Sequence, residues 1–344
     1  MALSIPTRFR SIPGRFALPL RYRNAALFAL LALLFGGTFV AIETGLRELP
    51  PLLFAGLRFD IGAAALIGYV LLRRPRSAWL PRTRRDIAGI AVAGVFIVAA
   101  NNALLFVGQG STTPAMASIM YGLNPVLAPV FAWWILDDRL SKTGMLGIGV
   151  ALAGVAAIVQ PSPSTLTGAG TVGQVLVLGA AAAVAIGSVL LKRVRPEMGS
   201  LPLTAWAMVL GAVLLHALSV AAGESPARAV GVGRLTLVSL LAVGIPSTAV
   251  AYAINFDLLE RIGPVRTNLV AYVVPVVAAL AGWALLGTGL SAATVAGFLI
   301  VVVGFGLVER QTLRCEVCRL RRWRRRRGGA GSARRAESPC PCDD

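Results

Sequence analysis

Charged residues are scarce in this sequence. They make up 14% of its 344 residues, and acidic residues number only 15, whereas soluble domains carry about 25% charged residues. Hydrophobic residues make up 56%, and the mean hydropathy is +0.76. A chain with so few charges and so many apolar side chains indicates that lipid surrounds most of it.

Cysteine and histidine are nearly absent from the apolar body. All four cysteines lie in the last thirty residues, so no disulfide framework holds the body together, and helix packing must do so. The single histidine, His216, has no second metal-binding residue near it in the sequence, and we assign it no role. No paired acidic motif, nucleophile with a base, or phosphate-binding loop occurs, so we expect neither an enzyme nor a cofactor.

Ten apolar runs indicate membrane helices. A helix needs about 20 apolar residues to cross the hydrocarbon core, and backbone in lipid must form its own hydrogen bonds. The runs cover residues 24–43, 50–72, 87–108, 114–136, 143–160, 171–191, 201–222, 235–256, 264–286 and 291–308. The sequence therefore predicts an all-α polytopic membrane protein with ten transmembrane helices.

The basic residues predict the orientation of these helices. The formal net charge is +18, but Lys and Arg cluster between the apolar runs, which favours membrane topology over nucleic-acid binding. With the N-terminus inside, 28 of the 33 Lys and Arg fall in inside segments, and only Arg47, Arg228 and Arg234 fall in outside loops. Because positive loops stay cytoplasmic, we expect a cell-membrane protein with both termini in the cytoplasm and residues 1–23 as a basic leader.

The two halves of the apolar body are similar at a fixed offset of 150 residues. The offset pairs Pro114 with Pro264, Pro125 with Pro275, Trp133 with Trp283, Ser141 with Ser291, Gly147 with Gly297, Gly154 with Gly304, Gly37 with Gly187, Gly94 with Gly244 and Phe106 with Phe256. We interpret residues 24–160 and 171–310 as two five-helix repeats. Since five is odd, the second repeat crosses the membrane in the opposite direction, and inverted repeats are typical of secondary transporters.

Three stretches carry a family resemblance. Residues 35–59 read FGGTFVAIETGLRELPPLLFAGLRF, residues 118–154 include Asn124, Pro125 and Asp138, and residues 251–306 include Tyr252 and Pro275. Together they resemble the drug/metabolite transporter superfamily and, within it, the EamA-type transporters. The acidic residue expected after the fourth helix is present as Asp138, but Thr288 replaces it in the second half.

The resemblance implies a mechanism as well as a fold. It implies two inverted five-helix repeats and a central cavity lined mainly by the first, third, fourth, sixth, eighth and ninth helices. It also implies transport of small metabolites by alternating access.

Eight polar residues within predicted helices are candidates for the substrate pathway. They are Asn101, Asn102, Tyr121, Asn124, Tyr252, Asn255, Asn268 and Tyr272. Polar side chains inside a membrane usually face the bundle interior, where they either bind a solute or hold helices together. As a cluster on the helices that the resemblance places around the cavity, they favour a site for a polar, hydrogen-bonding solute.

Four prolines within predicted helices are candidate hinges. Pro125, Pro129, Pro246 and Pro275 each remove one backbone hydrogen bond and free the carbonyl four residues earlier. In lipid a freed carbonyl must face protein or a water-filled cavity, so we expect these helices to bend beside the pathway. A static kink that only shapes packing is the alternative.

Arg58 and Asp60 place charges deep in the second predicted helix. A charge near the membrane midplane costs at least about 3 kcal/mol when it faces lipid. The two residues are about 200° apart around the helix, so they point to opposite sides. We expect Arg58 to pair with Glu43 or helix-end carbonyls in preference to contacting the substrate, and Asp60 to be either a desolvated, protonated carboxyl or a proton-coupling group.

The last residues, 311–344, form a cytoplasmic tail rich in Arg and Cys that we expect to be disordered. Its run from Arg319 to Arg327 predicts binding to anionic lipid headgroups. Cys315, Cys318, Cys340 and Cys342 have the number of thiolates that a zinc site needs, but the spacing of the second pair is atypical, and we predict no metal there. The sequence does not decide between a monomer and a homodimer.

These patterns favour a secondary transporter of small polar metabolites such as amino acids or related compounds, most simply an exporter. A passive facilitator or channel of the same fold is the first alternative, and it would carry solute only down the solute's own gradient. A membrane enzyme or receptor is the second. We expect a small-molecule substrate and no nucleic-acid partner.

Overall fold

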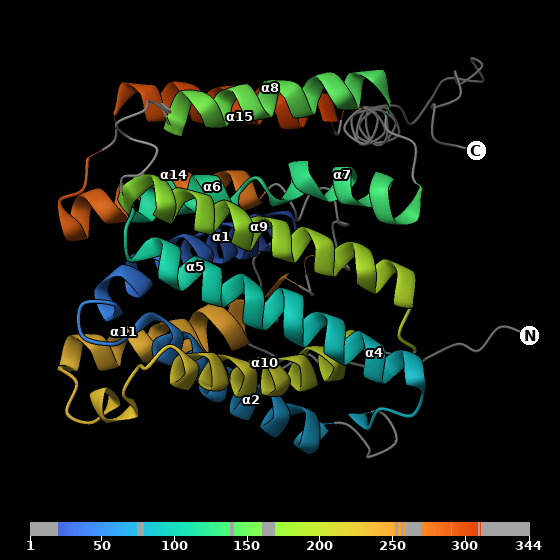
Figure 1. Cartoon of the computed structure of the whole chain (residues 1–344), viewed down its shortest axis with the longest axis vertical. Coiled ribbons are helices and arrows are strands. Elements are labelled where there is room, and N and C mark those ends of the chain that lie inside the picture. Colours follow the sequence, from blue (N-terminus) through green and yellow to red (C-terminus); the bar gives the residue numbers. More distant parts are fainter. Residues whose placement is uncertain are drawn as a thin grey trace, which may run out of the picture.

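The computed structural model describes residues 20–73, 79–137, 141–159, 169–251, 254–255, 258, 270–289, 291–308 and 310. Every regular element within these ranges is a helix (Figure 1). Several predicted features lie outside the described residues, namely the leader before residue 20, the tail with its four cysteines, Asp138, Tyr252 and Asn268.

The first half of the chain contains α1 (Leu20–Gly45), α2 (Pro51–Arg73), α4 (Arg84–Val92), the π-helix η1 (Ala93–Ala100), α5 (Asn101–Gln109), α6 (Pro114–Tyr121), α7 (Asn124–Leu136) and α8 (Lys142–Val159). The second half contains α9 (Ala169–Val194), α10 (Ser200–Ala221), the short 3₁₀ helix η2 (Pro226–Ala229), α11 (Arg234–Gly244), the π-helix η3 (Ile245–Val250), α14 (Val270–Leu286) and α15 (Ala292–Val308).

Six helical segments are long and apolar enough to cross a membrane. They are Arg23–Gly45, Pro51–Leu72, Arg84–Gln109, Pro114–Leu136, Gly170–Val194 and Ser200–Ala221. Shorter apolar helices, Lys142–Ile158, Arg234–Thr248, Val270–Leu286 and Ala292–Val308, coincide with the other four predicted runs. The predicted all-helical, multi-pass architecture is confirmed for the described residues, whereas the count of ten spans stays a prediction.

Local sequence signals explain where several helices begin. Thr83 accepts a hydrogen bond from the backbone of Asp86, whose side chain bonds back, so the two residues form a capping box at the start of α4. Thr113 caps α6 by accepting a hydrogen bond from the backbone of Met116, and Pro114 is the first residue of the helix. A proline at this position loses nothing, because the first N–H groups of a helix have no partner within the helix.

The helices lie side by side in layers (Figure 1). At one end of the molecule α8 packs along α15, and towards the other end α10 packs along α2. Between them, the buried Phe54 of α2 contacts Phe106 of α5 edge to face, with ring centroids 5.3 Å apart. This packing fixes the part of α2 that carries Arg58.

Glycines allow the backbones of α8 and α15 to touch. A Cβ atom on Gly147 would lie 2.6 Å from the carbonyl oxygen of Gly304, and one on Gly154 would lie 2.8 Å from that of Gly297. Residue numbers rise along α8 as they fall along α15, so the two helices are antiparallel. The two contacts are equivalent under the 150-residue offset, because Gly147 corresponds to Gly297 and Gly154 to Gly304.

A single methyl group at this crossing is expected to destabilise the protein. In Gly147→Ala the new Cβ would also lie 2.7 Å from the backbone nitrogen of Val308, so the helices must separate, at a cost of about 1–3 kcal/mol. We expect a lower thermal unfolding midpoint in detergent. Gly149→Ala is the matched control on the same helix, because its Cβ would meet nothing within 4 Å. Equal midpoints for the two variants would contradict this packing.

The two halves also share an unusual helix geometry at equivalent positions. The π-helices η1 and η3 overlap when the first half is shifted by 150 residues. The packing of these segments repeats as well, because Gly94 lies against Leu210 and Gly211 of α10, while Gly244 lies against Ile61 of α2. Wider π turns occur often at functional sites, and η1 leads directly into Asn101 and Asn102.

Candidate functional site

A cavity of about 450 Å³ lies between helices of both halves. Its walls come from α1, α2, α5, α6, α7, α9 and α14, together with Asn255. Phe35 and Phe39 of α1 and Phe59 of α2 form apolar parts of the lining. The helices named by the family resemblance therefore surround a cavity, and the second helix, α2, also contributes to its lining.

The structure brings most of the described candidate residues to this cavity. Asn101, Asn102, Tyr121, Asn124 and Asn255 all line it. Tyr272 packs against Phe305 with ring centroids 4.4 Å apart, and it is not among the lining residues that the structure describes.

Three polar lining residues were not singled out from the sequence. They are Thr38 of α1, Ser118 of α6 and Ser188 of α9. Thr38 and Ser118 lie within stretches that carry the family resemblance. Their hydroxyls bond to backbone carbonyls of their own helices, Thr38 to Leu34 at 2.7 Å and Ser118 to Ala115 at 2.7 Å. A hydroxyl that has its donor bond satisfied locally still offers an acceptor to a solute.

Arg58 reaches the cavity from α2 and is 8% exposed. Its Nε donates to Thr248 Oγ1 of η3 and its NH1 donates to Asn102 Oδ1 of α5, each at 3.3 Å. The guanidinium also lies 5.0 Å from the ring centroid of Phe59 and 5.9 Å from that of Phe106. We expected Glu43 or helix-end carbonyls as partners; two of the guanidinium's contacts are hydrogen bonds to a neutral hydroxyl and a neutral amide.

The fourth predicted helix is broken beside the cavity. It divides into α6 and α7 at Gly122 and Leu123, and Pro125 lies in the first turn of α7 instead of inside a continuous helix. Both Gly122 and Pro125 line the cavity. A break there leaves backbone groups beside a polar cavity, which is where irregular backbone in a membrane protein is tolerated.

The other three candidate hinges lie at different kinds of position. Pro129 lies inside α7 and Pro275 inside α14, where it is buried. Pro246 is the second residue of the π-helix η3, whose Thr248 accepts a hydrogen bond from Arg58. These positions are compatible with bending beside the pathway, which stays a proposal.

Asp60 faces away from the cavity and bonds to the one histidine. Its Oδ2 lies 2.7 Å from His216 Nε2 on α10. The side chains are 48% and 37% exposed on the outer face of the bundle. The imidazole lies over Gly56, where a Cβ would come within 2.7 Å of the ring. His216, to which we assigned no role from the sequence, is therefore a polar partner between α2 and α10.

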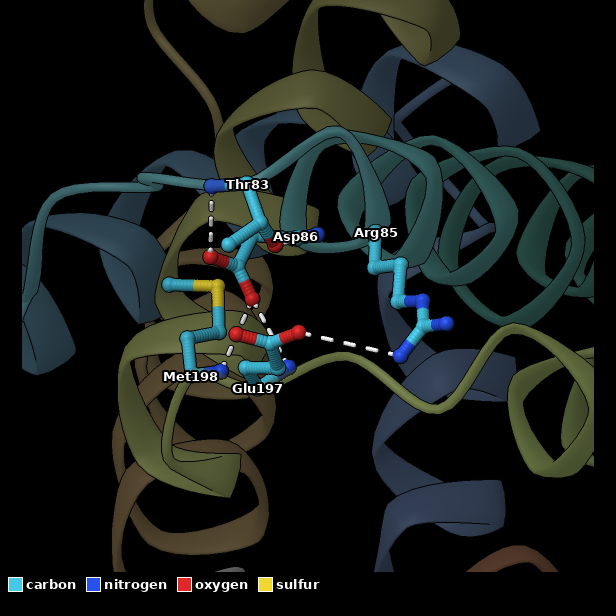
Figure 2. A network of polar contacts seen from close by, with 5 residues as sticks. All are labelled: Thr83, Arg85, Asp86, Glu197 and Met198. Carbon is cyan, nitrogen blue, oxygen red and sulfur yellow. Dashed lines mark hydrogen bonds and ion pairs between the residues drawn. The ribbon is translucent and has the colours of Figure 1, made fainter.

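A carboxylate joins two loops at one end of the bundle (Figure 2). Asp86 Oδ2 accepts from the backbone nitrogens of Arg82 and Thr83 at 3.1 and 3.0 Å. Its Oδ1 accepts from those of Glu197 and Met198, both at 2.8 Å, in the loop between α9 and α10. The buried carboxylate thus connects the start of α4 to the loop between the first two helices of the second half.

A matching junction lies at the opposite end of α2. Glu48, in the loop between α1 and α2, accepts from the backbone nitrogen of Gly233 at the start of α11, at 2.7 Å. The 150-residue offset places Glu48 on Met198 and Gly233 on Thr83. The same junction between a loop and the start of a helix therefore occurs at both ends. At one end the helix supplies the carboxylate, from Asp86, and at the other end the loop supplies it, from Glu48.

Asp86→Asn is expected to weaken its junction. The carboxylate accepts four backbone N–H bonds, and an amide would turn a donor towards some of them and leave these buried groups unsatisfied. We expect the thermal unfolding midpoint to fall by several degrees.

Arg85→Gln is the control for this change. Arg85 forms a 3.7 Å ion pair with Glu197 beside the same network (Figure 2), but its side chain is 66% exposed, and exposed pairs contribute little. A midpoint as low in Arg85→Gln as in Asp86→Asn would show that the carboxylate network is not the stabilising element.

Potential metal ligands do not gather in the part of the chain that the structure describes. No group of three or more His, Cys, Asp or Glu residues lies close enough there to hold a metal ion. The four cysteines of the tail lie outside these residues.

Comparison with known proteins identifies similar chains along nearly the whole apolar body. The family model described as the EamA-like transporter family matches twice, at residues 23–160 and 171–310. An uncharacterized transporter of Archaeoglobus fulgidus is 30% identical over 286 residues, which cover 83% of this chain and 98% of that protein. The uncharacterized inner membrane transporter YedA of Escherichia coli strain K12 is 29% identical over 287 residues, 82% of this chain and 90% of that protein.

Two further matches extend the comparison. A Salmonella typhimurium protein named a probable amino-acid metabolite efflux pump is 28% identical over 305 residues, 85% of this chain and 98% of that protein. A protein of known crystal structure is similar with a TM-score of 0.58 at 21% identity, covering 83% of this chain and 97% of its own. At that identity the structural likeness concerns the fold alone.

Proposed function

This chain is a multi-pass membrane protein that belongs to the EamA-like transporter family, and on that basis we propose that it is a secondary transporter of small polar metabolites, such as amino acids or related compounds. We propose further that it works as an exporter by alternating access. The observation that carries this proposal is the cavity within the bundle, whose largely apolar lining from both halves of the chain includes several amides, hydroxyls and a guanidinium. The name of the Salmonella relative, an amino-acid metabolite efflux pump, supports the direction and the substrate class.

The chemistry of the cavity suits a small polar solute. Amides, hydroxyls and a guanidinium face a space of about 450 Å³, a size within the range of small-molecule sites. Polar groups at membrane depth are expensive unless they are satisfied or used. Their convergence on one cavity favours solute binding over simple bonding between helices.

Several symmetric contacts support an inverted repeat. The fifth predicted helix of each unit, α8 and α15, cross in antiparallel fashion through paired glycines. The loop junctions at Asp86 and Glu48 lie at opposite ends of the bundle and correspond under the 150-residue offset. Inverted units of this kind adopt two mirror-related openings around one central site, which is the geometry that alternating access requires.

We propose that both termini are cytoplasmic and that the membrane is the cell membrane. The alternation of basic and neutral loops predicts that reporter fusions at Arg76 and Lys192 read as cytoplasmic and one at Ala169 as external. A cytoplasmic signal at Ala169 would contradict the arrangement of two five-helix units. The basic tail is proposed to bind anionic headgroups on the same side.

We also propose that the pair of Asp60 and His216 binds the coupling proton. The carboxylate and the imidazole lie 2.7 Å apart, and they join α2 of the first half to α10 of the second. Movement of one half against the other would make or break this contact. The candidate hinges Pro125, Pro129, Pro246 and Pro275 would permit that movement.

Transport in sealed vesicles tests the proposed function. The purified full chain would be reconstituted, a pH gradient imposed, and a panel of small polar solutes screened for uptake. We expect at least one solute to accumulate, saturably, above its equilibrium level. Equilibration without accumulation would indicate a passive facilitator. Uptake no greater than in protein-free vesicles for every solute would refute transport by this chain alone.

A further inference from the structure

We propose that the outer face of α2 and α10 is a homodimer interface, and that its partner is a second copy of this chain. The two helices pack along each other at one edge of the layered bundle (Figure 1). Their outer face carries a polar pair, two small residues and an apolar groove. The inference concerns assembly in the membrane, so it does not depend on which solute the protein transports.

The polar pair lies on this face at a depth where lipid would otherwise cover it. Asp60 and His216 bond to each other at 2.7 Å, but their side chains remain 48% and 37% exposed. Both belong to helices that are long and apolar enough to cross a membrane, and both lie more than one helical turn from the nearest end. A carboxyl group that faces hydrocarbon is strongly unfavourable. A polar partner outside the chain would therefore stabilise this face.

The polar pair is complementary to itself. Two copies that insert with the same orientation are related by a two-fold axis along the membrane normal, and in such an interface each residue meets its partner twice, once from each copy. Asp60 of one copy can therefore face His216 of the other, and the reverse. The second carboxylate oxygen of Asp60, Oδ1, forms no hydrogen bond within the described part of the chain. Two copies would bring two carboxylates and two imidazoles together, away from lipid.

Small residues beside the pair allow a second helix to approach closely. Ala64 and Gly68 follow Asp60 at intervals of four along α2, which places all three on one side of the helix. Ala64 is exposed, and a Cβ atom on Gly68 would meet nothing within 4 Å. By contrast, a Cβ atom on Gly62 of the same helix would lie 2.8 Å from Thr248, inside the bundle. Small residues four apart are common where two membrane helices touch.

An apolar groove near the C-terminal end of α2 lies level with an exposed leucine. The groove has a volume of about 80 Å³, and apolar residues of α2 and α10 line it together with Trp79. The indole of Trp79 stacks on that of Trp206, with ring centroids 6.3 Å apart. Leu72 of α2 is 86% exposed. Because the two-fold axis keeps each residue at its own depth, Leu72 of one copy can enter the groove of the other.

A second copy accounts for these features together. It supplies a polar partner for Asp60, a helix that can approach Gly68, and an apolar side chain at the depth of the groove. A lipid acyl chain could fill the groove, but it offers no hydrogen-bonding group to the carboxylate. The observations therefore favour a second copy over a bound lipid.

Cysteine cross-linking in the membrane tests this interface. Gly68→Cys would be introduced into a full chain whose four tail cysteines are replaced by serine, and the membranes would be treated with a short bifunctional thiol reagent. A residue close to a two-fold axis lies beside its own copy, so we expect most of this variant to be linked as a dimer. Leu299→Cys on α15, which is 58% exposed at the other end of the bundle, is the control and should stay monomeric.

A bulky substitution tests the same contact without cross-linking. Ala64→Trp places an indole on the outer face of α2, where it separates the two copies but not the helices within one copy. We expect the dissociation constant of the dimer, measured by light scattering in detergent, to rise roughly tenfold or more, with an unchanged thermal unfolding midpoint. Leu280→Trp, at a 61% exposed position on α14, is the matched control and should leave dimerisation intact.

The outcomes separate assembly from transport. Dimers that are linked through Gly68→Cys and weakened by Ala64→Trp support the inference. A monomeric wild-type chain at every protein-to-lipid ratio would overturn it, whether or not a lipid is retained in the groove. So would equal cross-linking at Gly68→Cys and Leu299→Cys, or a dimer that Ala64→Trp leaves unchanged. None of these results refutes the proposed transport, which is measured separately as solute uptake.

Discussion

Ala271→Trp is expected to stop solute flux while the protein stays folded. Ala271 lies on α14 and lines the cavity, so an indole at this position occupies space that the solute needs. The site is only half-buried, which leaves room for the larger side chain without disrupting the packed core. Uptake into vesicles should fall to the level of protein-free vesicles, with little change in the thermal unfolding midpoint.

Leu280→Trp is the matched control for this change. Leu280 lies on the same helix but is 61% exposed on the outside of the bundle, so an indole there faces lipid. We expect near wild-type uptake from this variant. Undiminished flux in well-folded Ala271→Trp would mean that the solute does not pass through this cavity.

Asp60→Asn is expected to abolish accumulation driven by a pH gradient and to leave solute exchange measurable. The asparagine keeps the size of the side chain and a hydrogen bond to His216, but it has no proton to release. Accumulation depends on coupling, whereas exchange between solute pools on the two sides does not. The measurement is uptake in sealed vesicles with and without the gradient, beside counterflow of labelled solute.

A second variant, at His216, tests the same coupling proposal independently. His216→Gln also removes a titrating group and retains a hydrogen-bonding side chain, so it should show the same loss of accumulation with retained counterflow. If the pair only connects α2 to α10, both variants should instead lower stability and abundance, with an unchanged ratio of accumulation to counterflow. Wild-type accumulation with unchanged pH dependence would exclude Asp60 from coupling.

Much of the architecture can be predicted from patterns that repeat along the chain. Apolar runs, and glycine and proline pairs at a 150-residue offset, are local or periodic signals, and they predict helices and duplication directly. The capping box of Thr83 and Asp86 is equally local. The candidate amides were found because polar residues inside apolar runs are conspicuous.

The contacts between distant residues could not be predicted in this way. Asp60 and His216 are 156 residues apart, and no pattern in the sequence connects them. Arg58 was expected near Glu43 because sequence reasoning favours close neighbours, whereas folding brings Thr248 and Asn102 to it. The break between α6 and α7 was also missed, because Pro125 was interpreted as an interior kink and not as the start of a helix.

Accessibility of the cavity from each side of the membrane tests alternating access most directly. A cysteine would be introduced as Ala128→Cys on α7, which lines the cavity, in a chain whose four tail cysteines are replaced by serine. A membrane-impermeant maleimide is then applied to either face of sealed vesicles. We predict labelling from both faces, slowed in each case by a transported solute. Labelling from one face only, while solute flux continues, would contradict a single cavity that opens to each side in turn.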